Sequence, residues 1–105
     1  NSKNMNKLKT IVSRYFTEFI EVETSEPKSY FRIDIFLPDG GRCSVGLENK
    51  TRFCPEFLHF NIRDSKIRLQ DSNAHNGKIN VFGNICVDKL NEYLKELQTV
   101  IKPLK

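Results

Sequence analysis

The sequence predicts an α+β fold: a two-layer sandwich in which an antiparallel sheet of four to five strands carries an N-terminal and a C-terminal helix on one face. A helical pattern near the C-terminus is the first observation, with apolar residues spaced three and four apart at Val87, Leu90, Leu94, Leu97 and Ile101. The second is period-two alternation from Phe31 to Leu37, which is typical of a half-buried strand. A second helical pattern at the start of the chain completes the α-β-β-β-β-(β)-α order.

The first helix is expected to run from about Asn4 to Ile20. Leu8, Ile11, Val12 and Phe16 belong to a broad apolar stripe along it. Its β-branched and aromatic residues lower its intrinsic propensity, so the helix must be held by packing. The polar run that follows, residues 21–29, is expected to be a connector or a short extra strand.

A β-hairpin is expected next, from Ser29 to Leu37 and from Arg42 to Glu48. Pro38-Asp39-Gly40-Gly41 joins its strands with strong turn chemistry. Cys43, Val45 and Leu47 alternate inward, so Cys43 should be a small buried residue. The remaining predicted elements are strands over 57–63 and 66–70, a short strand or extended segment over 78–82, and a helix from 85–87 to Lys102-Pro103.

Length and composition indicate one globular domain, residues 1–105, with 38% hydrophobic and 29% charged residues. The net charge of +4 is mild and spread along the chain, as on a solvated mixed surface. No apolar run is long enough for a transmembrane segment. The three cysteines are far apart and form no paired motif, which favours reduced thiols in the nucleus or cytoplasm.

No set of residues in the sequence has the spacing of a catalytic or metal-binding motif. His59 and His75 are not paired with cysteines at zinc-ligand spacing, and no two carboxylates are fixed at a catalytic distance. Glycine-rich phosphate-binding motifs do not occur. We therefore expect no enzyme activity, no catalytic or metal-ligating residues and no cofactor.

A basic surface is the main alternative to a purely structural sheet face. The cations expected on the face opposite the helices, together with His59, are Arg32, Arg42, Arg63, Lys66, Arg68 and Lys78. Such a face suits nucleic acid or an acidic phospholipid. Asp34, Glu48 and Asp64 interrupt it, and no aromatic RNA-binding motif accompanies it.

Most of the chain resembles an RWD domain, the non-catalytic relative of the ubiquitin-conjugating fold. The stretches that carry the resemblance are SRYFTEFIEV, ETSEPKS, FRIDIFLP, GRCSVGL, FCPEFLHFNI and VDKLNEYLKEL. The tyrosine-proline motif of that family is absent, with Phe53-Cys54-Pro55 in its place, and residues 71–83 depart from the pattern. These departures are similar to those of the divergent RWD domains of kinetochore proteins, which cap a coiled coil and dock partner peptides. The kinase-associated lipid-binding module and a TATA-binding-protein half-repeat share the element order.

The function expected from these features is a non-catalytic protein-protein interaction module within a larger nuclear or cytosolic assembly, with another subunit as its partner. The expected docking surfaces are the groove between the helices and the sheet edge. Tyr15, Phe19, Phe53 and Phe57 are the candidate anchors, because aromatic residues dominate interface hot spots. The alternative function is an anionic-ligand binder that uses the basic sheet face.

Overall fold

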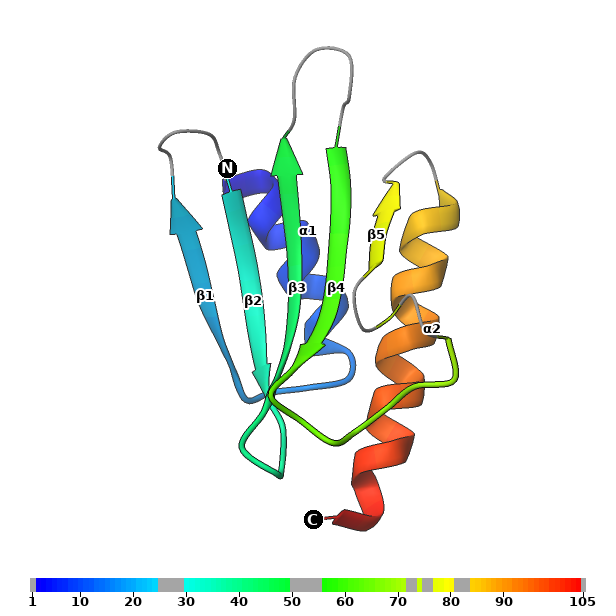
Figure 1. Cartoon of the computed structure of the whole chain (residues 1–105). Coiled ribbons are helices and arrows are strands. Elements are labelled where there is room, and N and C mark those ends of the chain that lie inside the picture. Colours follow the sequence, from blue (N-terminus) through cyan, green and yellow to red (C-terminus); the bar gives the residue numbers. More distant parts are fainter. Residues whose placement is uncertain are drawn as a thin grey trace.

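The computed structural model describes residues 2–24, 30–49, 56–71, 74, 77–80 and 84–104. Its elements, in chain order, are α1 (Ser2–Ser13), β1 (Phe19–Thr24), β2 (Tyr30–Phe36), β3 (Arg42–Asn49), β4 (Glu56–Arg63), β5 (Gly77–Asn80) and α2 (Asn84–Ile101), followed by the short 3₁₀ helix η2 (Lys102–Leu104) (Figure 1). The order confirms the predicted α+β class.

The sheet is an open antiparallel meander whose five strands lie side by side in sequence order, with β1 at one edge and β5 at the other (Figure 1). Residues opposite one another across paired strands share a face. Ile33, Val45 and Phe60 form one such row, and Asp34, Ser44 and Asn61 form the next row, on the other face. We call the face that carries Asp34 the open face, because the core lies on the opposite side.

One apolar core joins the covered face of the sheet to both helices. Ile33, Val45 and Phe60 are fully buried there. The α2 seam predicted from its three-four spacing is confirmed, since Leu90, Leu94, Leu97 and Ile101 are buried in the same cluster as the α1 residues Leu8, Ile11 and Val12. The Phe60 and Tyr93 rings lie 4.9 Å apart and link the sheet to α2.

The prediction that the first helix reaches Ile20 is wrong, because α1 ends at Ser13 and the chain then enters β1. In β1, Phe19 lies opposite Ile35 and Ile20 lies opposite Asp34. Phe19 packs against the core, whereas Ile20 lies on the open face. The β-branched and aromatic side chains of this stretch suit a strand better than a helix, and pairing with β2 decides between the two.

The predicted strand over 66–70 is also wrong, since this segment forms no strand. Ile67 and Leu69 are nevertheless buried, so their alternation arises from packing without strand pairing. The predicted strand over 78–82 corresponds to β5, which pairs with β4 and extends from Gly77 to Asn80. Residues 81–83 lie outside the described residues.

The Asp39 carboxylate holds the segment after β4 to the hairpin turn. It accepts hydrogen bonds from the backbone N–H of Lys66 (2.9 Å), the Ser65 hydroxyl (2.8 Å) and the backbone N–H of Gly41 (3.1 Å). These bonds, with the one from Lys66 the largest cause, hold the pKa of Asp39 below its ordinary value of 3.8. Side-chain hydrogen bonds therefore replace the strand pairing that the sequence pattern suggested here.

We expect Asp39→Asn to lower the melting temperature at neutral pH, because the folded state favours the charged carboxylate. A lowered pKa contributes stability above the unfolded-state value, and that contribution is lost as the pH falls through the folded-state value. The difference in melting temperature between wild type and variant should therefore shrink below about pH 4. Thermal unfolding followed by circular dichroism across this range measures it, with the exposed Asp88→Asn as control. A difference that is constant with pH contradicts the prediction.

Candidate functional site

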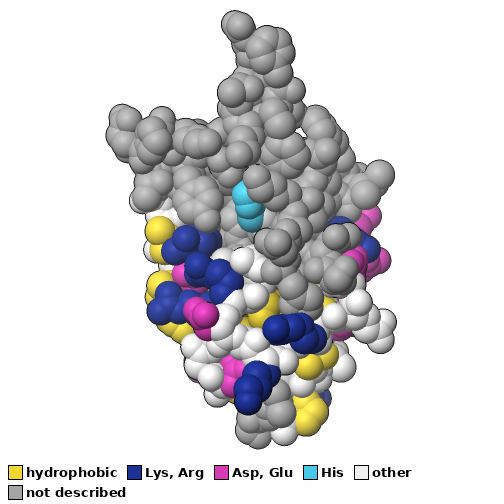
Figure 2. Space-filling model, in the orientation of Figure 1, with side chains coloured by type: hydrophobic (Ala, Val, Ile, Leu, Met, Phe, Trp, Pro, Cys, Tyr) yellow, Lys and Arg dark blue, Asp and Glu magenta, His cyan; other side chains and the backbone are white. Residues whose placement is uncertain are grey.

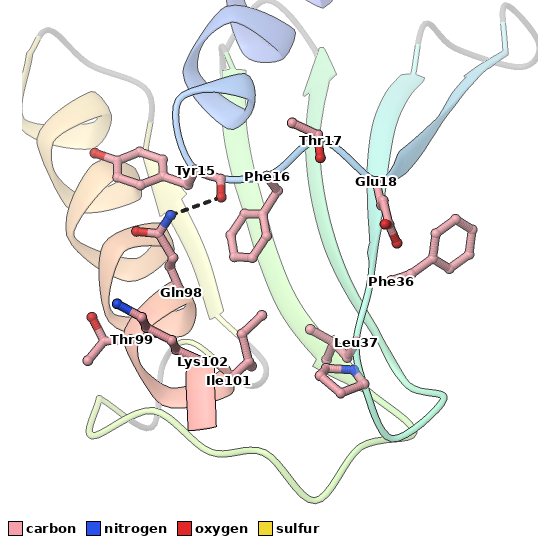
Figure 3. A pocket seen from close by; sticks show the side chains of 11 residues that line it. Tyr15, Phe16, Thr17, Glu18, Phe36, Leu37, Gln98, Thr99, Ile101 and Lys102 are labelled. Atoms are coloured by element: carbon pink, nitrogen blue, oxygen red, sulfur yellow. Dashed lines mark hydrogen bonds between the residues drawn. The ribbon is translucent and has the colours of Figure 1, made fainter. Parts of the chain in front are cut away.

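A hollow of about 780 Å³ lies where three segments distant in the sequence meet (Figure 3). Its walls are residues 15–18 after α1, residues 36–38 at the end of β2, and Gln98, Thr99, Ile101 and Lys102 at the end of α2 and in η2. We call it the end hollow. Two hydrogen bonds fix its α1–α2 side: the Tyr15 hydroxyl donates to Asn91 (2.9 Å), and the Gln98 amide donates to the Tyr15 carbonyl (3.1 Å).

The end hollow has an apolar floor and a polar rim. Phe16, Leu37 and Ile101 are buried, and Figure 3 shows their side chains converging at its centre. Glu18 and Thr99 are exposed at the rim. A concave site of this composition accommodates an apolar group and orients it with polar contacts around it.

The four predicted anchors lie in different environments. Tyr15 lines the end hollow but is half-buried, and its hydroxyl is used between the helices. Phe19 packs against the core from β1 and does not line the hollow. Phe53 lies outside the described residues, and only the backbone of Phe57 is described, in β4. Of the two anchors whose side chains are described, Tyr15 and Phe19, the structure brings Tyr15 to the candidate site.

Two large apolar side chains that the sequence reasoning missed are exposed on the open face: Ile20 (40% exposed) and Phe36 (44%). Phe36 also lines the end hollow, and in Figure 3 it points away from the floor residues. The sequence does indicate the exposure of Phe36. Ile33, Ile35 and Leu37 take the inward positions of the alternation, so Phe36 must point outward. The sequence gives no such signal for Ile20, because its segment also fits the apolar stripe of a helix.

An ionic cluster occupies the centre of the open face. The fully buried carboxylate of Asp34 accepts a hydrogen bond from the Ser44 hydroxyl (2.7 Å) and pairs with Arg32 Nε (2.8 Å). Arg42 Nη1 and Arg63 Nη2 lie farther from it, at 3.5 and 3.7 Å. We call Arg32, Arg42 and Arg63 around Asp34 the arginine cluster. Figure 2, which looks onto the open face, shows Lys and Arg side chains gathered there beside apolar ones.

The predicted basic face is only partly assembled. Arg32, Arg42 and Arg63 come together in the arginine cluster, whereas Lys66 and Arg68 lie in the segment after β4, outside the sheet. The Arg68 guanidinium donates to the carbonyls of Ser65 (2.7 Å) and Ile67 (2.9 Å) within that segment. The backbone of Lys78 lies in β5, opposite that of half-buried His59; the Lys78 side chain is outside the described set.

Asp34 is the central residue of the arginine cluster, a role that the sequence pattern does not reveal. In the sequence Asp34 interrupts a predicted basic face, but in the structure it is the common partner of all three arginines of the cluster. Ser44 lies opposite Asp34 on the neighbouring strand β3, and its buried hydroxyl donates to the carboxylate. The outward positions of three neighbouring strands, β2, β3 and β4, therefore build a polar site on the sheet.

The Cys43 thiol lies in the core, as predicted. Burial, with the charge of Asp34 as the smaller cause, raises its pKa, so the thiol stays protonated. Within the described ranges, no group of three or more His, Cys, Asp or Glu residues is placed to hold a metal ion. Neither helix, over the residues described, is long and apolar enough to cross a membrane.

Comparisons of the chain with protein-family models, with curated proteins and with solved structures found no match.

Proposed function

We propose that this chain is a non-catalytic protein-interaction module of RWD-like architecture that works within a larger nuclear or cytosolic assembly. One observation carries the proposal: the end hollow, exposed Phe36 and the arginine cluster form a continuous surface. Phe36 lines the hollow, and the Arg42 guanidinium lies 5.4 Å from the centre of its ring. The helix, antiparallel meander and second helix also agree with the RWD-like resemblance. Chromosome-segregation complexes are therefore the first assemblies in which to seek the partner.

The composition of this surface favours a protein partner. Interfaces combine an apolar centre with a polar rim and are enriched in aromatic residues and arginine. The buried floor of the end hollow is the apolar centre, and Glu18 and Thr99 belong to the polar rim. Phe36 and Arg42 are the aromatic residue and the arginine. β1 adds an edge strand, and edge strands recruit extended peptides by backbone pairing.

Obstructing the rim of the end hollow should strongly reduce partner capture without harming the fold. Thr99→Trp places a bulky side chain at the rim, and we expect it to reduce capture about tenfold or more. Thr10→Trp is the matched control, because both threonines are exposed on helices and donate to the carbonyl four residues earlier, at 3.0 Å for Thr99 and 2.8 Å for Thr10. The measurement is quantitative mass spectrometry of proteins retained by the immobilised chain from nuclear and cytosolic extracts treated with nuclease.

Phe36→Ser is the second variant of this experiment, since it removes the aromatic group that joins the hollow to the open face. A discrete protein retained by wild type and Thr10→Trp, but lost from Thr99→Trp and Phe36→Ser, supports the proposal. Equal retention by all four proteins overturns it. A catalytic turnover by the purified chain would equally contradict the non-catalytic assignment.

Binding of an anionic ligand, nucleic acid or acidic phospholipid, is the second candidate function. The arginine cluster favours it, because three guanidiniums share one carboxylate. Such binding should weaken steeply with salt, as counterions compete for the arginines. Retention of nucleic acid or lipid at low salt, and its loss at high salt, would favour this function over the protein-interaction module.

A further inference from the structure

The charges of the arginine cluster are not balanced within it. Asp34 has its short contacts with Ser44 (2.7 Å) and Arg32 (2.8 Å), while Arg42 and Arg63 lie 3.5 and 3.7 Å away. The Arg42 and Arg63 side chains are 46% and 42% exposed. Each guanidinium carries five N–H donors, and a single carboxylate occupies few of them. The cluster therefore keeps positive charge and outward-facing donors.

The same contacts hold these donors in place before any ligand arrives. The Asp34 charge attracts Arg42 and Arg63 from beneath, and the Phe36 ring supports Arg42 at 5.4 Å. A planar guanidinium fixed in this way can receive a carboxylate with two parallel hydrogen bonds at a reduced cost in side-chain entropy. Asp34 is thus both a stabilising partner and a positioning residue for this face.

Apolar groups lie directly beside the cations. Ile20 lies opposite Asp34 across β1 and β2, and Phe36 lies opposite Arg42 across β2 and β3. Both apolar side chains are exposed, so a ligand that covers the arginines also covers them. Complementarity therefore requires carboxylates and apolar side chains in the same ligand.

A polyanion fits this face less well than a peptide does. The backbone N–H of Phe36 donates to the Glu18 carbonyl (3.4 Å), which places exposed Glu18 beside Phe36 at the margin of the face (Figure 3). A continuous phosphate backbone would meet that negative charge and would leave Ile20 against polar groups. A peptide with spaced carboxylates can keep its charges away from Glu18, and its apolar residues can cover Ile20.

We propose that the open face binds an acidic segment of a protein partner, with carboxylates on Arg42 and Arg63 and apolar side chains on Ile20 and Phe36. The inference rests on the proposed function and names the chemistry of the partner. It also places the contact on the sheet, next to the end hollow.

Titration of the isotope-labelled chain with a short synthetic peptide of Glu and Leu residues tests the inference by NMR. The counterpart peptide has Gln at each Glu position. We expect the Glu/Leu peptide to bind about tenfold more tightly, with shift changes gathered on β1–β3 around Ile20, Phe36 and Arg42. Single-stranded DNA and phosphatidylserine vesicles are titrated in parallel, as the competing classes of anionic ligand.

Charge variants separate the face from the overall charge of the molecule. Arg42→Gln and Arg63→Gln should each weaken binding of the Glu/Leu peptide several-fold, whereas Lys95→Gln, an equal loss of charge on an exposed α2 residue, should not. Asp34→Asn should strengthen binding, because Asp34 contacts Arg42 and Arg63 only at 3.5 and 3.7 Å, so removing its competing charge outweighs the loss of its positioning effect. Glu23→Gln gives the same charge change on β1 and should leave affinity unaltered. Poor folding would weaken peptide binding in every variant. An arginine variant that binds more weakly, together with an Asp34→Asn variant that binds more tightly, therefore cannot be explained by misfolding.

Equal binding of the two peptides, or shift changes confined to other surfaces, overturns the inference. Binding of DNA or vesicles without the Glu/Leu peptide also overturns it and favours the anionic-ligand function. If the acidic peptide fails while Thr99→Trp and Phe36→Ser still strongly reduce partner capture, the interaction module stands and only the acidic chemistry of the partner falls.

Discussion

Asp34→Asn is expected to lower the free energy of unfolding by about 3 kcal/mol, the lower end of the range for breaking a buried ion pair. The Asp34 side chain is fully buried, and the variant leaves three guanidiniums close together without the charge that they share. Because Arg42 and Arg63 are partly exposed, water relieves some of the repulsion, which is why we do not expect a larger loss. The measurement is urea unfolding followed by circular dichroism.

Glu23→Gln is the control for Asp34→Asn, since it removes the same charge from an exposed position on β1. We expect its effect to stay within about 0.5 kcal/mol. If the two variants unfold at the same urea concentration as wild type, Asp34 does not stabilise the open face. A destabilised Asp34→Asn that also binds the Glu/Leu peptide more tightly would show stability and binding opposing one another at a single carboxylate.

The elements that sequence periodicity predicted well are those in which one period explains every residue. The α2 seam and the hairpin around Gly40 are of this kind. The stretch from Tyr15 to Ile20 is ambiguous, because its apolar residues satisfy a helical stripe until β2 is available for pairing. Over 66–70, Ile67 and Leu69 alternate as a strand would, but Asp39 holds that backbone through side-chain bonds. Long-range contacts decided both cases.

The candidate site was less predictable than the fold. The end hollow joins segments around residues 16, 37 and 99, and no local pattern brings these together. The sequence predicts part of the arginine cluster, because Arg32, Asp34 and Arg42 occupy outward positions of the predicted hairpin. What the sequence lacked was the pairing of β3 with β4, which brings Arg63 opposite Arg42.

Gly41→Ala is expected to lower the free energy of unfolding by about 2–3 kcal/mol, as overpacking against a rigid neighbour does. A Cβ at Gly41 would lie 2.5 Å from the Asp64 carbonyl oxygen and 2.7 Å from that of Arg63. Both obstacles are backbone, and Asp64 already has a positive φ of 54°, so the end of β4 must move. Urea unfolding measures the loss.

Gly40→Ala is the matched control for Gly41→Ala, because a Cβ there meets nothing within 4 Å although φ is +90°. It should cost about 1–2 kcal/mol, from backbone strain alone. A Gly41→Ala variant no less stable than Gly40→Ala would mean that the turn yields to the new methyl group. If instead the end of β4 shifts, Arg63 moves relative to Arg42, and Gly41→Ala should weaken acidic-peptide binding while Gly40→Ala leaves it intact. The close approach at Gly41 would then support the fold and also set the spacing of the two arginines that we propose receive the partner.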